Sequence, residues 1–204
     1  MGRKRHHYEV AFEEFLRDRR IPYVSVNEAR KALLPERAAL TVANGQTSDN
    51  LKSFDFVIYG DGANLLVEVK GRKVGRPSGE PGTRLPTRSQ LQSWVTREDV
   101  DSLGTWETLF GDGFEAVIVF VYWCDAPPPD GLFQEVFIHR DRWYALRSAR
   151  LSDYREHMKT RSERWKTVFV PTARFEQISH PFAPPPGPRP DPGPGVPLVD
   201  PIGA

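Results

Sequence analysis

The chain has 204 residues, 39% of them hydrophobic, which fits one domain of ordinary size with a substantial core. Its formal net charge is +1, so no global field attracts nucleic acid or a membrane surface, and any basic surface must be local. The single cysteine, Cys124, excludes an internal disulfide and an ordinary cysteine-based zinc site, which favours a reducing compartment.

The first predicted element is an amphipathic helix over residues 8 to 19. Its apolar stripe consists of Val10, Ala11, Phe12, Phe15 and Leu16. Ile21-Pro22 ends this helix, residues 23 to 26 predict a short strand, and Asn27 suits the cap of a second helix over residues 28 to 34. A polar loop is expected over residues 41 to 53. The basic N-terminus has no apolar stretch behind it, which predicts no signal peptide.

The most informative stretch is residues 54 to 70, where two apolar β-type runs flank Asp61-Gly62. This dipeptide is a strong signal for a two-residue hairpin turn. In such a hairpin the numbers of opposite residues sum to 123, and a four-residue loop gives the same sum. Asp55 then lies across from Glu68, and Lys70 shares their face. The other face is predicted to be wholly apolar and to carry Phe54, Phe56, Ile58, Leu65, Val67 and Val69.

Facing carboxylates repel each other, because directly opposite Cβ atoms lie only about 4.5–5.5 Å apart. One carboxyl group can keep its proton, with its pKa raised by the other. A divalent cation between the two also removes the repulsion, since Mg²⁺ takes carboxylate oxygens and keeps several waters. In a third interpretation both groups are simply solvated near a strand end, beside Lys70. The hairpin alone leaves these three interpretations open.

The remaining elements are predicted in chain order. Residues 71 to 88 are rich in Gly and Pro and predict a loop, and residues 89 to 109 predict a helix with a break near Asp99 or Gly104. Residues 114 to 123 predict a buried strand, whose apolar run from Ala116 to Trp123 is too short to span a bilayer. A hairpin over residues 133–139 and 143–147, a helix over residues 154–164 and a strand over residues 165–170 complete a mixed α/β domain, with helices on both sides of a small sheet.

The C-terminal segment differs in composition from the rest of the chain. Residues 181 to 204 hold ten of the 19 prolines, which predicts a polyproline-like or disordered tail. The predicted organisation is therefore one domain over residues 1 to 180 and a Pro-rich tail over residues 181 to 204. We expect a cytoplasmic protein with no membrane partner.

Glu9 and Glu13 lie four residues apart on the first helix and share a face. That helix packs on the sheet, which can bring one of the two carboxylates to the edge of the Asp55/Glu68 pair. Such a set suits metal-assisted hydrolysis of a phosphodiester, in which carboxylates hold Mg²⁺ or Mn²⁺ and the metal generates hydroxide from bound water. Lys70 can orient or deprotonate that water, or bind the phosphate as a point charge.

The segment after the hairpin is basic. Its positive side chains are Lys70, Arg72, Lys73, Arg76, Arg84 and Arg88, against the single acid Glu80. Glycines allow a close approach to a backbone, so this loop can order on a polyanion such as DNA. Gln90, which opens the following helix, can contact a phosphate or the attacking water. The alternative is a solvated loop whose charge is balanced by acids elsewhere.

Asp55, followed after a hairpin by Glu68-Val69-Lys70, resembles the PD-(D/E)XK nuclease superfamily, and residues 7 to 13 (HYEVAFE) resemble the bacterial HYExAFE family of uncharacterised proteins. The first resemblance implies a restriction-endonuclease-like core over residues 7 to 170. It implies Asp55 and Glu68 as metal ligands, Lys70 as the catalytic lysine, and Glu9, or alternatively Glu13, as the helix carboxylate and third ligand. Phe54 stands where many members have proline, which leaves the charged positions intact.

The function that the resemblance implies is a Mg²⁺-dependent nuclease acting on DNA, with branched and nicked DNA among the candidate substrates and a homodimer among the candidate assemblies. The alternative is a binding module for nucleic acid or protein that keeps the fold without the activity. A third interpretation is a core hairpin whose carboxylates are incidental.

Overall fold

The computed structural model describes residues 6–27, 41–44, 47–60, 62–74, 91–125, 127–128, 133 and 135–182, with only the backbone described for residues 41–44 and 47–50. The predicted helix over residues 28 to 34 lies outside the described residues. So do most of the predicted basic loop and nearly all of the predicted tail.

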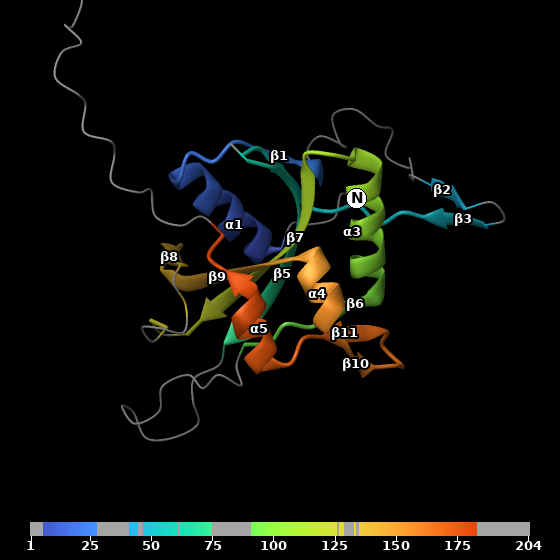
Figure 1. Cartoon of the computed structure of the whole chain (residues 1–204). Coiled ribbons are helices and arrows are strands. Elements are labelled where there is room, and N and C mark those ends of the chain that lie inside the picture. Colours follow the sequence, from blue (N-terminus) through green and yellow to red (C-terminus); the bar gives the residue numbers. More distant parts are fainter. Residues whose placement is uncertain are drawn as a thin grey trace, which may run out of the picture.

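The centre of the described structure is a mixed sheet with the strand order β1-β4-β5-β7-β9-β12, to which β8 adds by pairing with β9 (Figure 1). The strands are β1 (Tyr23–Ser25), β4 (Phe56–Ile58), β5 (Asn64–Val74), β7 (Phe114–Cys124), β8 (Glu135–His139), β9 (Arg142–Arg150) and β12 (Ser179–His180). The β5 and β7 strands are parallel, and the other pairs are antiparallel. The mixed sheet flanked by helices confirms the predicted α/β class.

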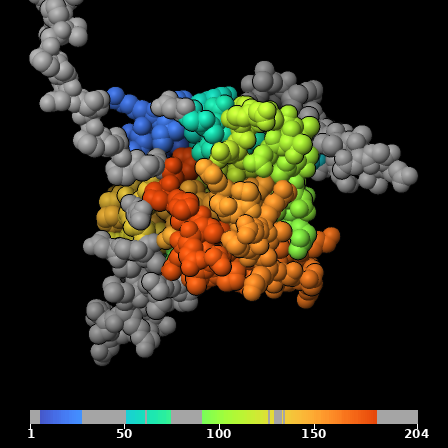
Figure 2. Space-filling model, viewed as in Figure 1, coloured from blue at the N-terminus to red at the C-terminus, as the bar shows by residue number. Residues whose placement is uncertain are grey.

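The helices cover both faces of this sheet. They are α1 (His7–Asp18), α3 (Arg97–Phe110), α4 (Leu151–His157) and α5 (Thr172–Ile178). The α1 helix packs its apolar stripe on one face, in a core with Phe56, Val67 and Val119. The other three helices cover the opposite face, which Figure 2 shows in space-filling form. None of the helices within the described residues is long and apolar enough to cross a membrane.

Two smaller sheets flank the central one. The strands β10 (Lys159–Ser162), β11 (Thr167–Phe169) and β6 (Val95–Thr96) form one, and β2 (Thr41–Asn44) and β3 (Thr47–Asn50) form the other. The predicted loop over residues 41 to 53 is therefore wrong over its first part. Its polar residues lack the apolar alternation by which a strand is normally recognised.

The predicted hairpin register is confirmed, because Phe56, Val57 and Ile58 pair with Val67, Leu66 and Leu65. The predicted apolar face is confirmed for Phe56, Ile58, Val67 and Val69, which are buried in the core under α1. The opposite face of the hairpin is apolar in part as well, since Val57 and Leu66 are buried on the α3 side. Phe54 also lies on the α3 side, because the chain bends at Asp55 and the alternation restarts there.

The α3 helix begins at Arg97, not at Ser89, and runs unbroken past Asp99 and Gly104. Residues 91 to 94 form neither helix nor strand, and buried hydroxyl groups bind their carbonyls: Tyr122 donates to Gln92 (3.0 Å) and Tyr154 donates to Ser93 (2.6 Å). Gly104 does not break the helix. It makes room for Arg155, whose guanidinium lies where a Cβ atom would be.

Three further boundaries differ from the predictions. The β5 strand continues through Val74, so residues 71 to 74 are strand and not loop. The helix predicted over residues 154 to 164 is α4, which ends at His157 and gives way to β10, because Met158 is extended. The tail prediction begins too early, since Phe182 packs against Phe12 with ring centroids 5.1 Å apart.

Candidate active site

A polar cavity of about 380 Å³ lies where α1, the end of the 51–55 segment and β5 meet. The cavity is lined by Glu9 from α1, by Lys52 and Asp55, and by Glu68 and Lys70 from β5. These residues are distant in sequence, and the antiparallel pairing of β4 with β5 brings Asp55 and Glu68 together.

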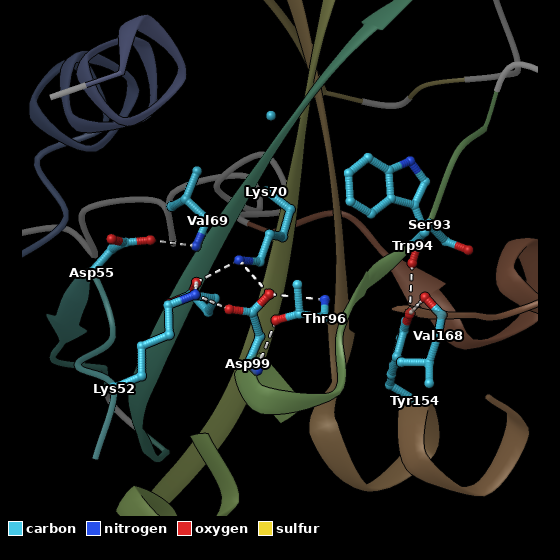
Figure 3. Close-up of polar contacts among 12 residues, drawn as sticks. Lys52, Asp55, Val69, Lys70, Ser93, Trp94, Thr96, Asp99, Tyr154 and Val168 are labelled. Carbon is cyan, nitrogen blue, oxygen red and sulfur yellow. Dashed lines mark hydrogen bonds and ion pairs between the residues drawn. The ribbon is translucent and has the colours of Figure 1, made fainter. Parts of the chain in front are cut away.

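Asp55 sits just before β4, where its backbone N–H donates to the carbonyl of Val67 at 2.9 Å. Its carboxylate accepts a hydrogen bond from the backbone N–H of Val69 at 2.8 Å (Figure 3). Burial raises the pKa of Asp55 to about 6, and the nearby charge of Glu9 acts in the same direction. The hydrogen bond from Val69 and the charges of Lys70 and Lys52 oppose this shift.

Glu68 is buried in the β5 strand on the face that α3 covers. Burial raises its pKa to about 7, the negative charge of Asp55 adds to the shift, and Lys70 opposes it. The Nζ atom of Lys70 lies 2.6 Å from Oε1 of Glu68, and Nζ of Lys52 lies 3.8 Å from the same oxygen. The half-buried carboxyl group of Asp55 and the buried one of Glu68, both with raised pKa values, therefore share this part of the cavity.

Asp99, which the sequence did not identify as a site residue, holds the two lysines from the other side. Its carboxylate lies 2.8 Å from Nζ of Lys70 and forms a second ion pair with Lys52 (Figure 3). Burial alone would raise the pKa of Asp99, but Lys70 and Lys52 outweigh it and hold this pKa well below its usual range. A charged chain of two lysines and two carboxylates thus links β5 to the first turn of α3.

The same carboxylate also caps α3. Asp99 and Thr96 form a reciprocal capping box, in which each side chain accepts a hydrogen bond from the backbone N–H of the other. The Thr-x-x-Asp spacing was the one signal that could have placed the helix start here. Its contact with Lys70 joins residues far apart in sequence, which no local pattern reveals.

The two glutamates of α1 have different surroundings. Glu9 lines the cavity, and its charge contributes to the raised pKa of Asp55. Glu13 is buried one turn away, where its carboxylate accepts hydrogen bonds from Arg17 (2.9 Å) and Tyr23 (2.8 Å), and it does not line this cavity. Of the two alternatives, Glu9 is the one beside Asp55.

The donors in the cavity suit a hard cation. Asp55 and Glu68 supply carboxylate oxygens, and Mg²⁺ is commonly held by one or two carboxylates together with several waters. Among the described residues, no group of three or more His, Cys, Asp or Glu side chains is placed to hold a metal ion. The chemistry of the donors suits a hard cation, and Glu9 lines the same cavity as Asp55 and Glu68.

The basic residues predicted to bind nucleic acid have separate placements. Arg72 is not on a loop: it is buried in β5, where its guanidinium stacks 3.9 Å from the ring centroid of Trp94 and donates to the carbonyl of Gly71 at 2.6 Å. Burial lowers the pKa of Arg72 to about 10. Lys73 is half exposed and lies 3.6 Å from the carboxylate of Asp125. Arg76, Arg84, Arg88 and Gln90 lie outside the described residues.

Known proteins resemble this chain in backbone structure and not in sequence. No family model matches the sequence, and no curated protein does. Among the similar solved structures is Hjc, a Holliday junction resolvase from the archaeal hyperthermophile Archaeoglobus fulgidus. It aligns at a TM-score of 0.44 and 16% identity, covering 83% of this chain and 90% of that one. A TM-score this low does not support a functional assignment, which therefore depends on the residues of the cavity.

Proposed function

We propose that the protein is a divalent-metal-dependent nuclease that hydrolyses DNA phosphodiester bonds in this cavity. The observation that carries the proposal is that half-buried Asp55 and buried Glu68 line the same cavity, with Lys70 Nζ at 2.6 Å from Glu68 Oε1. Burial raises the pKa of each carboxyl group, and a neighbouring carboxylate adds to the shift, Glu9 for Asp55 and Asp55 for Glu68. Shifts of this kind are typical of functional sites. A bound cation would favour the charged form of both groups and so offset the burial that raises their pKa values.

Each residue has a proposed role in this reaction. Asp55 and Glu68 hold Mg²⁺ or Mn²⁺, and the metal, when bound, neutralises phosphate charge and lowers the pKa of a coordinated water. Lys70, whose pKa Glu68 and Asp99 raise against the effect of burial, stays charged and binds the phosphate as a point charge. Glu9 is the proposed helix carboxylate in preference to Glu13, because Glu9 lines the cavity.

The proposal also covers the family, the DNA substrate, the assembly and the cellular location of the protein. The Asp55, Glu68 and Lys70 pattern supports a restriction-endonuclease-like core, and residues 7 to 13 support membership of the HYExAFE family. Branched or nicked DNA is the proposed substrate, a homodimer the proposed assembly and the cytoplasm the proposed location. Arg76, Arg84, Arg88 and Gln90 are proposed to contact the DNA backbone, and Lys73 extends that surface from β5.

A non-catalytic binding module is the second candidate, and a specific observation favours it. Lys52 and Lys70 already neutralise Glu68 and Asp99, so the charges of the cavity are partly balanced without a metal. Such a protein would bind DNA with the same surface and leave it intact.

The decisive experiment is incubation of the purified protein with plasmid, nicked and four-way-junction DNA in Mg²⁺, in Mn²⁺ and in EDTA. We expect cleavage only with metal, and its loss in Asp55→Asn, Glu68→Gln and Lys70→Met. The matched control is Glu14→Gln, which removes an exposed carboxylate from the same helix as Glu9 and should cleave normally. Cleavage that survives EDTA or Glu68→Gln would overturn the proposal, and binding without cleavage would establish the second candidate.

A further inference from the structure

The β10–β11 hairpin is exposed and strongly basic. It carries Lys159, Arg161, Arg164 and Lys166, all exposed, against the one acid Glu163. None of these four cations forms an ion pair with a carboxylate elsewhere in the described part of the chain. Four cations with one acid on a single short hairpin favour a polyanionic partner.

An aromatic side chain stands at the turn of this hairpin. Trp165 has 69% of its surface exposed, the largest fraction among the exposed large hydrophobic residues of the described structure. The turn is fixed by two hydrogen bonds, from Trp165 N–H to Ser162 Oγ (3.3 Å) and from Lys166 N–H to the carbonyl of Glu163 (3.1 Å). Arg164 lies over the indole, 5.3 Å from its centroid. The structure therefore presents an indole ring to solvent between cations.

The hairpin is continuous with the cavity. The guanidinium of Arg161 lies 4.9 Å from the ring centroid of Trp94, whose other contact is the guanidinium of Arg72 at 3.9 Å. Both Trp94 and Arg72 line the cavity.

The backbone makes the same connection. The carbonyl of Lys166 accepts a hydrogen bond from Arg97 N–H (2.8 Å), at the start of the helix that carries Asp99. Figure 1 shows β10 and β11 beside β6, at the end of α3 where that helix begins.

We propose that the β10–β11 hairpin binds the DNA substrate next to the cavity, with Trp165 stacked on an unpaired base and the four cations on phosphates. This inference rests on the proposed function and names the class of substrate, which is DNA with an unpaired or splayed base beside the cleaved bond. Stacking on an aromatic side chain is typical of single-stranded contacts, because every base has a π-face and an unpaired base exposes it.

The test measures DNA binding by fluorescence anisotropy in Ca²⁺ or EDTA, so that cleavage is not required. With a four-way junction or a splayed duplex, Trp165→Ala should weaken binding about tenfold, within the roughly 5- to 150-fold range of a lost base stack, and Trp165→Phe should restore most of it. With blunt, fully paired duplex the effect should be small. The double variant Lys159→Gln/Arg164→Gln should lower the salt slope of log K by about 2.

The control variants are on the other hairpin tip, between β8 and β9. Ile138→Ala removes an exposed hydrophobic side chain, and Arg140→Asn removes an exposed charge at a backbone position with φ 50° that Asn tolerates. Both should bind like the wild type.

The outcomes separate the two proposals. Junction binding that depends on Trp165 without any cleavage supports the hairpin and overturns the nuclease. Cleavage together with unchanged binding by the Trp165 and charge variants overturns the hairpin. Loss of binding to phosphatidylcholine/phosphatidylserine vesicles, and not to DNA, in the Trp165→Ala variant would also overturn it, because the partner would then be a membrane surface.

Discussion

Asp99 is bound from two directions. Its carboxylate accepts the backbone N–H of Thr96 at the start of α3 and forms ion pairs with Lys52 and Lys70. Lys52 is itself held close to α3, because its carbonyl accepts a hydrogen bond from the indole N–H of Trp106 at 2.9 Å. Removing the charge of Asp99 would leave two buried or half-buried ammonium groups with fewer partners.

We therefore expect Asp99→Asn to lower the free energy of unfolding by about 3 kcal/mol, the usual range for breaking a buried ion pair. Thr96→Ala removes the capping hydroxyl and keeps the ion pairs, so it should cost only about 1 kcal/mol. Urea unfolding of both variants measures the difference. Equal losses would mean that Asp99 acts as a helix cap and not as the partner of the lysines.

Glu68 gives the stability a pH dependence. Its pKa is about 7 in the folded protein, above the value of 4.5 for an ordinary glutamate. Between these two pH values the folded state holds a proton on Glu68 that the unfolded state has lost. The free energy of unfolding therefore falls as the pH rises toward 7. A shift of this size corresponds to about 3 kcal/mol. Asp55 acts in the same direction, and Asp99 stays ionised throughout this range.

The measurement is urea unfolding from pH 5 to pH 8 in EDTA, compared with Glu68→Gln. In the variant, most of the fall in the free energy of unfolding with rising pH should be gone. His7 cannot cause this fall, because burial lowers its pKa and its contribution to stability therefore rises with pH. Mg²⁺ should restore stability near pH 8 in the wild type, because it binds only the deprotonated pair. If the wild type and Glu68→Gln had the same pH profile, Glu68 would not be the source of the pH dependence of stability.

At the scale of elements, β5 serves both faces of the sheet. Glu68, Lys70 and Arg72 alternate with Val69 and Gly71, and Gly71 lies directly under the ring of Tyr8 from α1. A Cβ atom at position 71 would collide with that ring. The glycine thus allows the first turn of α1, which carries Glu9, to lie close to the strand.

Gly71→Ala should cost about 1–3 kcal/mol, as expected for overpacking, and should displace the start of α1. The double variant Tyr8→Ala/Gly71→Ala should recover part of the loss, because the colliding ring is gone. Gly62→Ala is the control, since a Cβ atom there meets nothing within 4 Å. Thermal unfolding of the three variants tests this, and a neutral Gly71→Ala would contradict the close packing.

Elements with strong local signals were predictable from the sequence. The apolar stripe of α1, the register of β4 with β5 and the apolar run of β7 each depend on sequence signals within a few residues. The pairing of β8 with β9 was predictable for the same reason. These signals were enough to bring Asp55 and Glu68 together.

The remaining features depend on contacts between distant residues. Residues 91 to 94 have helix-like apolar spacing, but they lie outside the helix and their carbonyls accept hydrogen bonds from Tyr122 and Tyr154. Lys52 and Asp99 meet across 47 positions of sequence, so neither could be recognised as part of the site. The sequence preferred Glu9 to Glu13, and the structure adds that Arg17 and Tyr23 bind Glu13 away from the cavity.

At the scale of the whole molecule, the end of the described chain closes one of the two cores. The β12 strand pairs with β9, and Phe182 packs on Phe12 while its N–H donates to the carboxylate of Glu135. This part of the predicted tail therefore belongs to the domain.

We expect a chain ending at Phe182 to unfold within about 0.5 kcal/mol of the full chain, and one ending at Ile178 to lose about 3 kcal/mol or more through the missing strand and ring. Urea unfolding of the two truncated chains measures this. A large loss on removing residues 183 to 204 alone would show that the Pro-rich segment stabilises the domain.

The parallel pairing of β5 with β7 also determines when the site can form. Every pair in that ladder is separated by 50 positions, as Asn64 and Phe114 are, and α3 with Asp99 lies in the connection between them. Contacts of such long range form slowly, because the intervening chain must first be closed. During synthesis, a ribosome-bound chain that already displays Asp55, Glu68 and Lys70 still lacks the strand on which β5 packs. The complete cavity would thus form only after the strand ending at Cys124 has left the ribosome.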